Sequence, residues 1–329
     1  MIKYMVTGGA GFIGSNLVAA LNARGETDVL VVDHLNHPLK RRNLEGLRYA
    51  RYLDKHDLRA ALRAGDCASV ETIFHLGACS STTERDLAYL ADNNTAFTRD
   101  LCAWALAGNR RFIYASSAAT YGGGEQGYSD APERIPLLRP LNPYGQSKQD
   151  FDLLAMREGW LDRIAGLKYF NVFGPHEHHK GEMRSVVHKA HGQIRRTGRL
   201  QLFRSHRPDY RDGEQTRDFV YVRDAVAVTL FFHDHPGIAG LFNCGTGRAR
   251  TWLDLGRAVF AAMGLEPRIE FIDMPPDLRE HYQYHTEADL ARLRACGCNH
   301  AFTSLEAGVR DYVASDLAGH PEEQDTCAS

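Results

Sequence analysis

The chain has 329 residues, of which 43% are hydrophobic, so it can bury a sizeable core as one large domain or as two lobes. A formal net charge of −2 leaves no basic excess of the kind that nucleic-acid-binding proteins carry, and no apolar run approaches the roughly 18 residues of a membrane helix. The first apolar run begins almost at Met1 and the seven cysteines are scattered, so we expect no signal peptide and free thiols in a cytoplasmic protein.

Short apolar runs alternate with amphipathic stretches through the first two thirds of the chain. The expected strands are Tyr4–Thr7, Val29–Val32, Thr72–His75, Arg111–Ala115 and Leu167–Tyr169. The expected helices are Gly14–Arg24, Leu58–Ala64, Asn94–Ala107 and Ser147–Arg157. This alternation predicts an α/β fold, in which a Rossmann-type, doubly wound parallel sheet is joined by a smaller α/β lobe.

The character of the sequence changes after Asn171–Pro175, where a His-rich loop, a basic helix and a polar stretch follow. We expect residues 1–173 and about 219–245 to form the first domain. Residues of about 174–218 and 246–318 are expected to form the second, substrate-binding domain. The polar and acidic residues 319–329 are expected to be an unpacked tail.

Three glycines, Gly8, Gly11 and Gly14, lie between the first strand and the first helix. Glycine is needed there because a side chain would block the tight turn, the approach of the backbone to a pyrophosphate, and close packing of helix on strand. The N-terminus of the helix then offers unpaired N–H groups to the phosphates. These glycines predict that the first domain binds NAD(P).

Asp33 ends the second strand about twenty residues beyond the glycines, where a carboxylate can accept hydrogen bonds from the ribose hydroxyls of NAD. Nearby basic residues, Lys40, Arg41, Arg42 and Lys55, could instead neutralise the 2′-phosphate of NADP, or could form a solvated face. Asp33 alone favours NAD, and the basic residues keep NADP open.

Tyr144 and Lys148 are four residues apart, so on a helix they face the same side. Tyrosine has an ordinary pKa of about 10, and a neighbouring ammonium favours its phenolate form, which makes it usable as a base. Ser117 follows a predicted strand, at the edge of the sheet where ligands bind in such folds. Its hydroxyl could hydrogen-bond the substrate oxygen that becomes a carbonyl.

Together, these features resemble the extended short-chain dehydrogenases/reductases that act on nucleotide sugars. Several further stretches are closely similar to one branch, the ADP-L-glycero-D-manno-heptose 6-epimerase family. They are Phe74–Glu84, Asp92–Asn94, Tyr169–Pro175, His179–Gly181 and Arg217–Val222. The similarity extends from the first strand to Tyr312.

The resemblance implies an isomerase that inverts C-6 of the heptose in ADP-D-glycero-β-D-manno-heptose, for the lipopolysaccharide inner core. It implies tightly held NADP, transient oxidation at C-6, and a homo-oligomer, by resemblance a pentamer. An epimerase returns hydride to both faces of a ketone, so two acid/base groups are expected. By resemblance these are Tyr144 and Lys180, with Lys148 and Ser117 in support.

The resemblance also assigns binding residues. The cofactor contacts beyond the three glycines are Phe12, Ile13, Asp33, His34, Lys40, Lys55, Leu76, Gly77, Ala78, Cys79, Ser80, Asn93, Lys148 and Val172. The substrate contacts are Asn171, Glu182, Lys189, Phe203, Arg204, Ser205, His206, Arg217 and Tyr282. For Arg217 there is an independent reason, because a guanidinium suits a diphosphate. Without the family, Tyr282 is as easily a packed aromatic residue.

Some positions depart from the usual family pattern. His34 stands for an asparagine, Leu76 for a glutamate and Glu182 for a serine, and the stretch Arg207–Thr216 is longer. The change at His34 leaves the choice between NADP and NAD open. A carboxylate at Glu182 could repel the substrate diphosphate.

Other functions share some of these sequence features. A C-4 epimerase or a 4,6-dehydratase shares the fold, but a dehydratase commonly has an Asp-Glu pair where this chain has Ala118-Ala119. A non-catalytic dinucleotide sensor is a further alternative, although such proteins usually lose the tyrosine or the lysine. We expect no metal at Cys296, Cys298 and His300, nor in the loop of His176, His178 and His179.

Overall fold

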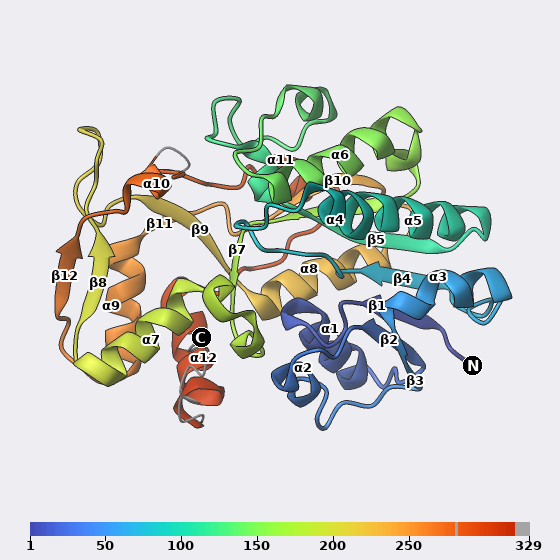
Figure 1. Ribbon diagram of the computed structural model, residues 1–329, viewed down its shortest axis with the longest axis horizontal. Helices are drawn as coiled ribbons and strands as arrows, with labels where there is room; N and C mark the ends of the chain where they lie inside the picture. The colour runs from blue at the N-terminus through green and yellow to red at the C-terminus, as the bar shows by residue number, and fades with distance from the viewer. Residues whose placement is uncertain (280–281, 320–329) are drawn as a thin grey trace.

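The computed structural model describes residues 1–279 and 282–319. Its larger part is a parallel sheet covered by helices on both faces, and its smaller part lies beside the carboxyl ends of these strands (Figure 1). In spatial order, the seven strands of the sheet are β10 (Gly240–Cys244), β6 (Ala165–Tyr169), β5 (Arg111–Ser117), β4 (Thr72–His75), β1 (Tyr4–Thr7), β2 (Val29–Asp33) and β3 (Arg51–Asp54). The predicted fold class is confirmed.

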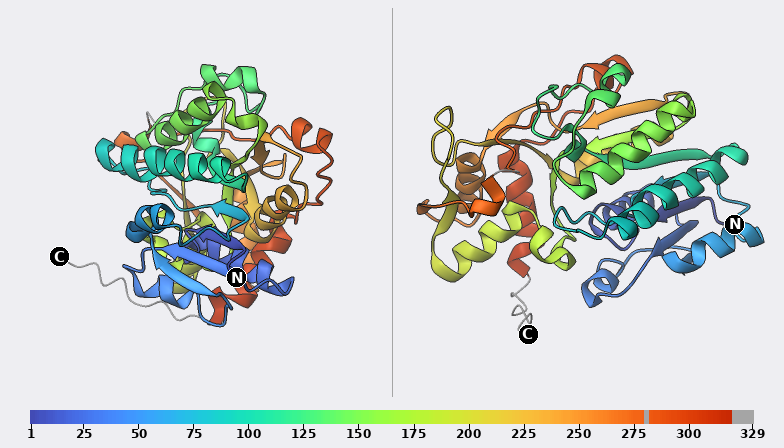
Figure 2. Two further views of the ribbon diagram at one scale, coloured as in Figure 1. Left: turned by 90° about the vertical axis from the view of Figure 1, so that its right-hand side faces the viewer. Right: turned by 45° about the horizontal axis from the view of Figure 1, so that its top comes forward.

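The alternation of side chains along β1 shows why the sheet is covered twice. Tyr4 and Val6 belong to the core on one face, whereas Met5 belongs to the core on the other. Helices α1 (Phe12–Ala23) and α8 (Val222–Asp234) cover the first face. Helices α3 (Lys55–Ala64), α5 (Phe97–Ala107) and α6 (Pro143–Arg157) cover the second, as the turned views show (Figure 2).

The smaller part has two short sheets. One consists of β11 (Ala249–Thr251), β9 (Thr216–Tyr221) and β7 (Asn171–Phe173), and the other of β12 (Ile269–Ile272) and β8 (Leu200–Phe203). Its main helices are α7 (Val186–Thr197), α9 (Trp252–Ala262) and α12 (Leu305–Ser315). These elements enclose a separate hydrophobic core around Phe173, Val187 and Val259.

Short elements complete the chain. The short α-helices are α2 (Pro38–Arg42), α4 (Leu87–Leu90), α10 (Pro276–Arg279) and α11 (Ala291–Ala295). A π-helical turn, η1 (Ala91–Ala96), precedes α5. The 3₁₀ turns are η2 (Ala118–Tyr121), η3 (Pro132–Leu137), η4 (Trp160–Asp162), η5 (His178–Met183) and η6 (Leu317–Gly319).

The five predicted strands are present, and two strands of the large sheet, β3 and β10, were not predicted. The residues of β3 are all half-buried and lack the apolar run of an inner strand, and β10 is the other edge strand of the sheet. The first helix begins at Phe12 instead of Gly14, and the last predicted helix begins at Pro143, which places Tyr144 on it. The expected helix from Asn94 is wrong at its start, because Asn94 belongs to the π-helical turn.

The chain after β10 contributes to both cores. Leu293 and Cys298 pack in the core of the large sheet, whereas Leu305 and Val309 pack in the core of the smaller part. The proposed domain boundaries therefore stay a prediction. Of the expected tail, residues 320–329 lie outside the described part of the chain.

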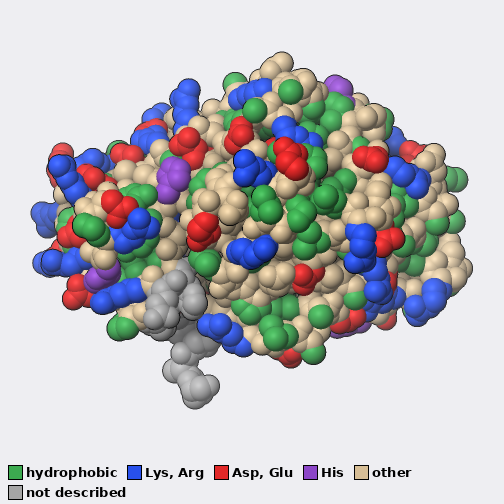
Figure 3. Space-filling view, turned by 90° about the horizontal axis from the view of Figure 1, so that it is seen from above, with side chains coloured by type: hydrophobic (Ala, Val, Ile, Leu, Met, Phe, Trp, Pro, Cys, Tyr) green, Lys and Arg blue, Asp and Glu red, His purple; other side chains and the backbone are tan. Residues whose placement is uncertain are grey.

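The surface carries both signs of charge. On the face seen from above, Lys and Arg side chains are interspersed with Asp and Glu, in keeping with a net charge of −2 (Figure 3). Among the residues that the structure describes, no helix combines the length and apolar character needed to cross a membrane.

Candidate active site

The glycine turn after β1 leaves no room for larger residues. Gly8 has a φ of +68°, and a Cβ atom on Gly14 would lie 2.0 Å from the carbonyl oxygen of Gly8. A Cβ atom on Gly8 would lie 2.7 Å from the backbone nitrogen of Gly77, after β4. The turn is thus packed backbone against backbone, which leaves the N-terminus of α1 open toward a ligand.

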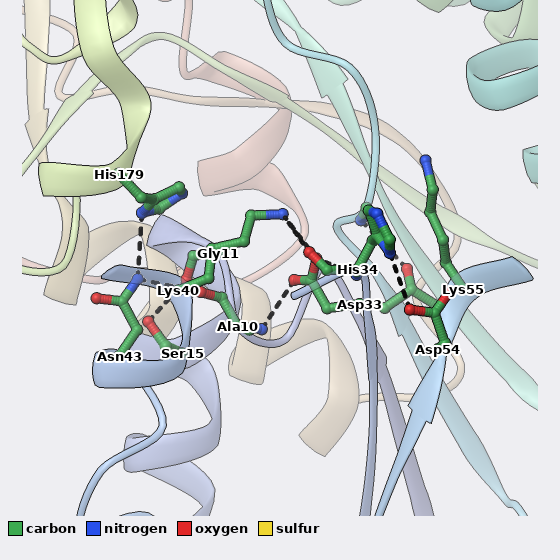
Figure 4. Close-up of polar contacts among 12 residues, drawn as sticks. Ala10, Gly11, Ser15, Asp33, His34, Lys40, Asn43, Asp54, Lys55 and His179 are labelled. Carbon is green, nitrogen blue, oxygen red and sulfur yellow. Dashed lines mark hydrogen bonds and ion pairs between the residues drawn. The ribbon is translucent and has the colours of Figure 1, made fainter. Parts of the chain in front are cut away.

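The carboxylate of Asp33, at the end of β2, is already engaged by the protein. Its Oδ2 atom accepts from the backbone N–H of Ala10 at 2.9 Å, and its Oδ1 atom accepts from Nζ of Lys40 at 2.8 Å (Figure 4). Beside it, Nδ1 of His34 lies 2.9 Å from Oδ2 of Asp54. The charge of Asp33 is therefore paired with a cation.

Lys55 adds a second cation at this end of the sheet. Its Nζ donates to Oδ1 of Asn93 at 2.8 Å. Burial lowers the pKa of Lys55, and the charge of Lys40 lowers it further. Two ammonium groups that repel each other in this way favour an anion between or beside them.

A cavity of about 700 Å³ runs from this basic end to the ends of β5 and β6. Its size is typical of sites for cofactors and small molecules. All of the predicted cofactor contacts and all four predicted catalytic residues line it: Gly8, Gly11, Phe12, Ile13, Gly14, Asp33, His34, Lys40, Lys55, Leu76, Gly77, Ala78, Cys79, Ser80, Asn93, Ser117, Tyr144, Lys148, Val172 and Lys180. An elongated dinucleotide fits this lining, with the basic residues at one end and the tyrosine at the other.

Tyr144 and Lys148 lie one turn apart on α6 and face β5. Nζ of Lys148 donates to the carbonyl oxygen of Ala115 at 2.8 Å. Burial lowers the pKa of Lys148 to about 8, with Asp152 and Cys79 opposing this. Burial raises the pKa of Tyr144, while a hydrogen bond with the side chain of Ser117 lowers it. The serine, tyrosine and lysine thus form one contiguous group.

Lys180 reaches the same cavity from η5, which follows β7. Its Nζ lies 5.3 Å from the centre of the Phe12 ring, at the start of α1. Burial lowers its pKa, and the buried carboxylate of Glu177 opposes this. Glu177 holds the loop by accepting from the hydroxyl of Ser185 at 2.6 Å. Lys180 is therefore a second candidate acid/base in the cavity that Tyr144 lines.

Two asparagines that the sequence analysis did not assign hold this site together. The Asn43 side chain donates to the carbonyl oxygens of Ala10 (3.0 Å) and His176 (3.1 Å), which ties the glycine turn to the Lys180 loop. Its third partner is Nδ1 of His179, at 3.2 Å (Figure 4). Asn94 accepts from the backbone N–H of Cys79 at 2.8 Å and donates to the hydroxyl of Ser147 on α6 at 2.9 Å.

The nine predicted substrate contacts lie outside the residues that line this cavity. Arg217, on β9, is buried between Trp252 and Tyr282, whose rings are 5.4 and 5.1 Å from its guanidinium carbon. Its Nη1 atom donates to the carbonyl oxygen of Thr216 at 2.8 Å. Tyr282 accepts from Nε1 of Trp252 at 2.8 Å. Arg217, Trp252 and Tyr282 thus form a cluster that is separate from the lining of the dinucleotide cavity.

The other predicted substrate contacts are more exposed. Glu182 pairs with Lys189 at 3.1 Å, with side chains that are 90% and 41% exposed. Phe203 ends β8, and the loop that follows it contains Arg204, Ser205 and His206. Asn171 is exposed at the start of β7.

The cysteine and histidine sets that the sequence analysis considered for metals have other partners. Nε2 of His300 lies 2.8 Å from Oδ1 of Asp224, and Cys298 is buried in the main core. Nε2 of His178 lies 2.9 Å from Oδ2 of Asp316. Within residues 1–279 and 282–319, the ligand atoms of His34, Asp54 and His56 lie within 4.8 Å of one another.

The family follows from a comparison of the whole sequence. The family model described as "NAD dependent epimerase/dehydratase family" matches residues 4–245, which include the glycine turn, Tyr144 and Lys148. The chain belongs to the NAD dependent epimerase/dehydratase family. A nicotinamide dinucleotide is therefore its cofactor, and the glycine turn and the cavity fit that cofactor.

Two proteins of the same name are similar to this chain over nearly its whole length. An ADP-L-glycero-D-manno-heptose-6-epimerase from Nitratidesulfovibrio vulgaris is 52% identical over 316 residues, which cover 96% of this chain and 98% of the relative. The crystal structure of the ADP-L-glycero-D-manno-heptose-6-epimerase from Helicobacter pylori has a TM-score of 0.79 at 25% identity, with 95% of each chain covered. The expected resemblance to heptose epimerases is confirmed.

Another similar solved structure contains NAD. The UDP-glucose 4-epimerase from Thermus thermophilus, solved in complex with NAD, has a TM-score of 0.74 at 27% identity and covers 95% of this chain and 98% of its own.

Proposed function

We propose that this protein is the epimerase that inverts C-6 of ADP-D-glycero-β-D-manno-heptose to give the ADP-L-glycero sugar, a lipopolysaccharide inner-core precursor. The observation that carries the proposal is the pairing of two acid/base candidates, Tyr144 and Lys180, at a single dinucleotide cavity. Relatives with this name that are about half identical over nearly the full chain support the choice of sugar.

The residues divide the chemistry between them. A nicotinamide dinucleotide bound in this cavity would supply the reversible hydride transfer at C-6. Tyr144, as phenolate, removes the proton of the C-6 hydroxyl, so that the carbon–oxygen single bond becomes a ketone. Ser117 donates a hydrogen bond to that oxygen, and the ammonium of Lys148 favours the phenolate.

Inversion needs hydride return to the other face of the ketone, so the oxygen must take its proton from another direction. Lys180 is placed by η5, outside the α6 helix that carries Tyr144, and we assign it this second acid/base role. Partial burial and the lowered pKa of Lys180 make it a better proton donor than a lysine in water.

We assign NADP as the cofactor. The carboxylate of Asp33 already accepts hydrogen bonds from the backbone of Ala10 and from Nζ of Lys40, so its negative charge is paired with a lysine. Lys40, Lys55 and His34 surround this position, and a 2′-phosphate would relieve the repulsion between the two lysines. Released cofactor, identified by its mass after denaturation of the purified protein, distinguishes NADP from NAD.

The experiment that tests the function follows C-6 by NMR during incubation with ADP-D-glycero-β-D-manno-heptose. Wild type is expected to reach an equilibrium of both epimers. Tyr144→Phe and Lys180→Met are each expected to cut turnover by roughly 10²–10⁴-fold while cofactor stays bound. A Lys180→Met rate equal to that of wild type would remove this lysine from the mechanism.

We also propose a homo-oligomer, a pentamer by family resemblance. Light scattering behind size exclusion measures the molar mass directly. A monomer of 36.8 kDa in that measurement would contradict the proposal.

A further inference from the structure

Behind the catalytic group lies an ion pair with no exposure to solvent. Nζ of Lys168, on β6, is 2.7 Å from Oδ2 of Asp152, on α6, and both side chains are 0% exposed. Taking two charges out of water is costly, and the cost is recovered only with excellent geometry and further hydrogen bonds. Neither residue lines the cavity, so cofactor binding does not explain the pair.

Helical spacing places Asp152 in line with the catalytic residues. On α6, Lys148 follows Tyr144 by four residues and Asp152 follows Lys148 by four more, so all three side chains point toward β5. The carboxylate accepts from Ser116 at 2.7 Å and from the hydroxyl of Tyr114 at 2.8 Å. The helix that carries the base is therefore fastened to the strand that ends in Ser117.

Lys168 fastens the turn after that strand. Its Nζ donates to Oγ1 of Thr120 at 2.6 Å, and Thr120 in turn donates to the carbonyl oxygen of Ser117 at 2.8 Å. In the sheet, Lys168 is the register partner of Ser116, directly beside Ser117. One ammonium thus connects α6, β6 and the η2 turn.

We infer that Asp152 and Lys168 are positioning residues for the proposed epimerisation. The pair holds α6 against β5 and η2, which fixes Tyr144 and Lys148 relative to Ser117. In addition, Lys168 neutralises Asp152, so that Lys148 is not drawn along the helix to the carboxylate and remains available to the tyrosine. The inference rests on the proposed function for its kinetic readout.

The charge balance around Lys148 makes this testable. The groups that face it are Asp152 and Tyr144 from its own helix, His75 from β4 and the thiol of Cys79. Burial and the charge of Lys148 lower the pKa of His75 to about 3, so His75 is neutral, and Asp152, one helical turn from Lys148, is the carboxyl group that acts on it. Removing either member of the pair therefore changes the field at Lys148, with opposite signs.

In the proposed mechanism Lys148 acts as an ammonium, so activity falls as pH rises through its pKa; this loss, together with that of the Lys180 proton, forms the alkaline limb of the pH–rate profile. Asp152→Asn removes the negative charge and should move this limb to lower pH, by about one unit. Lys168→Met leaves the carboxylate unneutralised and should move it to higher pH. The double variant carries neither charge, so its limb should lie between those of the two single variants, with kcat lowered about tenfold because the link to Thr120 is lost.

A matched control separates charge effects from damage to the fold. Asp224 is a buried carboxylate outside the cavity that accepts from Thr303 and contacts His300. Asp224→Asn should lower stability without moving the alkaline limb. The inference would be overturned if the alkaline limb of the pH–rate profile kept its wild-type pH in both Asp152→Asn and Lys168→Met, or moved in the same direction in both.

Two further readouts keep the test decisive. A single variant leaves one buried charge unpaired and can fail to fold, whereas the double variant has no unpaired buried charge at this place. If the double variant has the kcat of wild type, the positioning role is refuted. If wild type does not turn over the ADP-heptose, the proposed function fails. The Asp152–Lys168 pair is then tested through the pKa of the Tyr144 phenol in the cofactor-bound protein. This pKa is measured by ultraviolet titration of tyrosinate, as the titration curve of the protein with Tyr144 minus the curve of Tyr144→Phe.

Discussion

The cofactor-binding end and the substrate-binding end of the molecule differ in how well the sequence predicts which residues come together. At the cofactor end, all predicted contacts line one cavity, and most of them lie at strand ends of the seven-stranded sheet or in the turns and helices that follow these strands. At the substrate end, the predicted contacts are spread over β7, α7, β8, β9 and the region of Tyr282. Sheet topology therefore gathers the first set of residues, whereas packing between distant segments must gather the second.

Among changes in binding, the strongest is expected at the cofactor end, from Gly14→Ala. The new methyl group would lie 2.0 Å from the carbonyl oxygen of Gly8, and backbone cannot move aside cheaply. Overpacking of about 3 kcal/mol corresponds to roughly 100-fold weaker dinucleotide binding. Fluorescence titration with NADPH measures it. Gly25→Ala, at a glycine with φ of +84° and open space around it, controls for general loss of stability.

A smaller effect is expected at the substrate end, from Arg217→Lys. The charge is kept, but the planar guanidinium that stacks between Trp252 and Tyr282 is lost. Charged hydrogen bonds contribute about 1.5–3 kcal/mol, so we expect KM for the ADP-heptose to rise at least tenfold with NADP affinity unchanged. An unchanged KM would separate Arg217 from the substrate and weaken the assignment of this whole region.

Lys40→Ala returns to the cofactor end and tests the choice of dinucleotide. Loss of one cation beside Asp33 should weaken NADP binding about tenfold and leave NAD binding nearly unchanged. Isothermal titration with each dinucleotide measures the ratio. Equal weakening of both would indicate that Lys40 supports the Asp33 turn and does not recognise a 2′-phosphate.

The smallest effect is expected from Glu182→Ser, at an exposed position of the substrate end. The pair with Lys189 is exposed, and such pairs contribute about 0–1 kcal/mol. Freeing Lys189 for a phosphate should lower KM by about twofold at low salt, and the gain should vanish at high salt. A raised KM would show that Glu182 itself contacts the sugar.

The sequence predicted the fold well where local chemistry determines it. The glycines, the apolar strands and the four-residue spacing of Tyr144 and Lys148 each have a short-range physical reason. β3 was missed because its half-buried residues lack an apolar run, and the π-helical turn at Asn94 was missed because its geometry depends on contacts with Cys79 and Ser147.

Long-range contacts explain the rest. Asn43 joins the glycine turn to the Lys180 loop over 133 residues of chain, and no local pattern marks it. Lys168 reads as an ordinary strand residue, although Asp152 could have been found from its four-residue spacing to Lys148. The position of Lys180 at the cavity was available only through family resemblance.

The proposed epimerisation depends on oxidation and reduction at C-6, so that the hydrogen on C-6 leaves as hydride and returns to the same carbon at the Tyr144 site. Epimerisation in deuterium oxide, with NMR or mass analysis of the product, tests this step. Because hydride held on a nicotinamide does not exchange with water, we expect inverted sugar with no deuterium bonded to C-6. Deuterium at that carbon would mean that C-6 is deprotonated instead of oxidised, and would refute the proposed function of Tyr144.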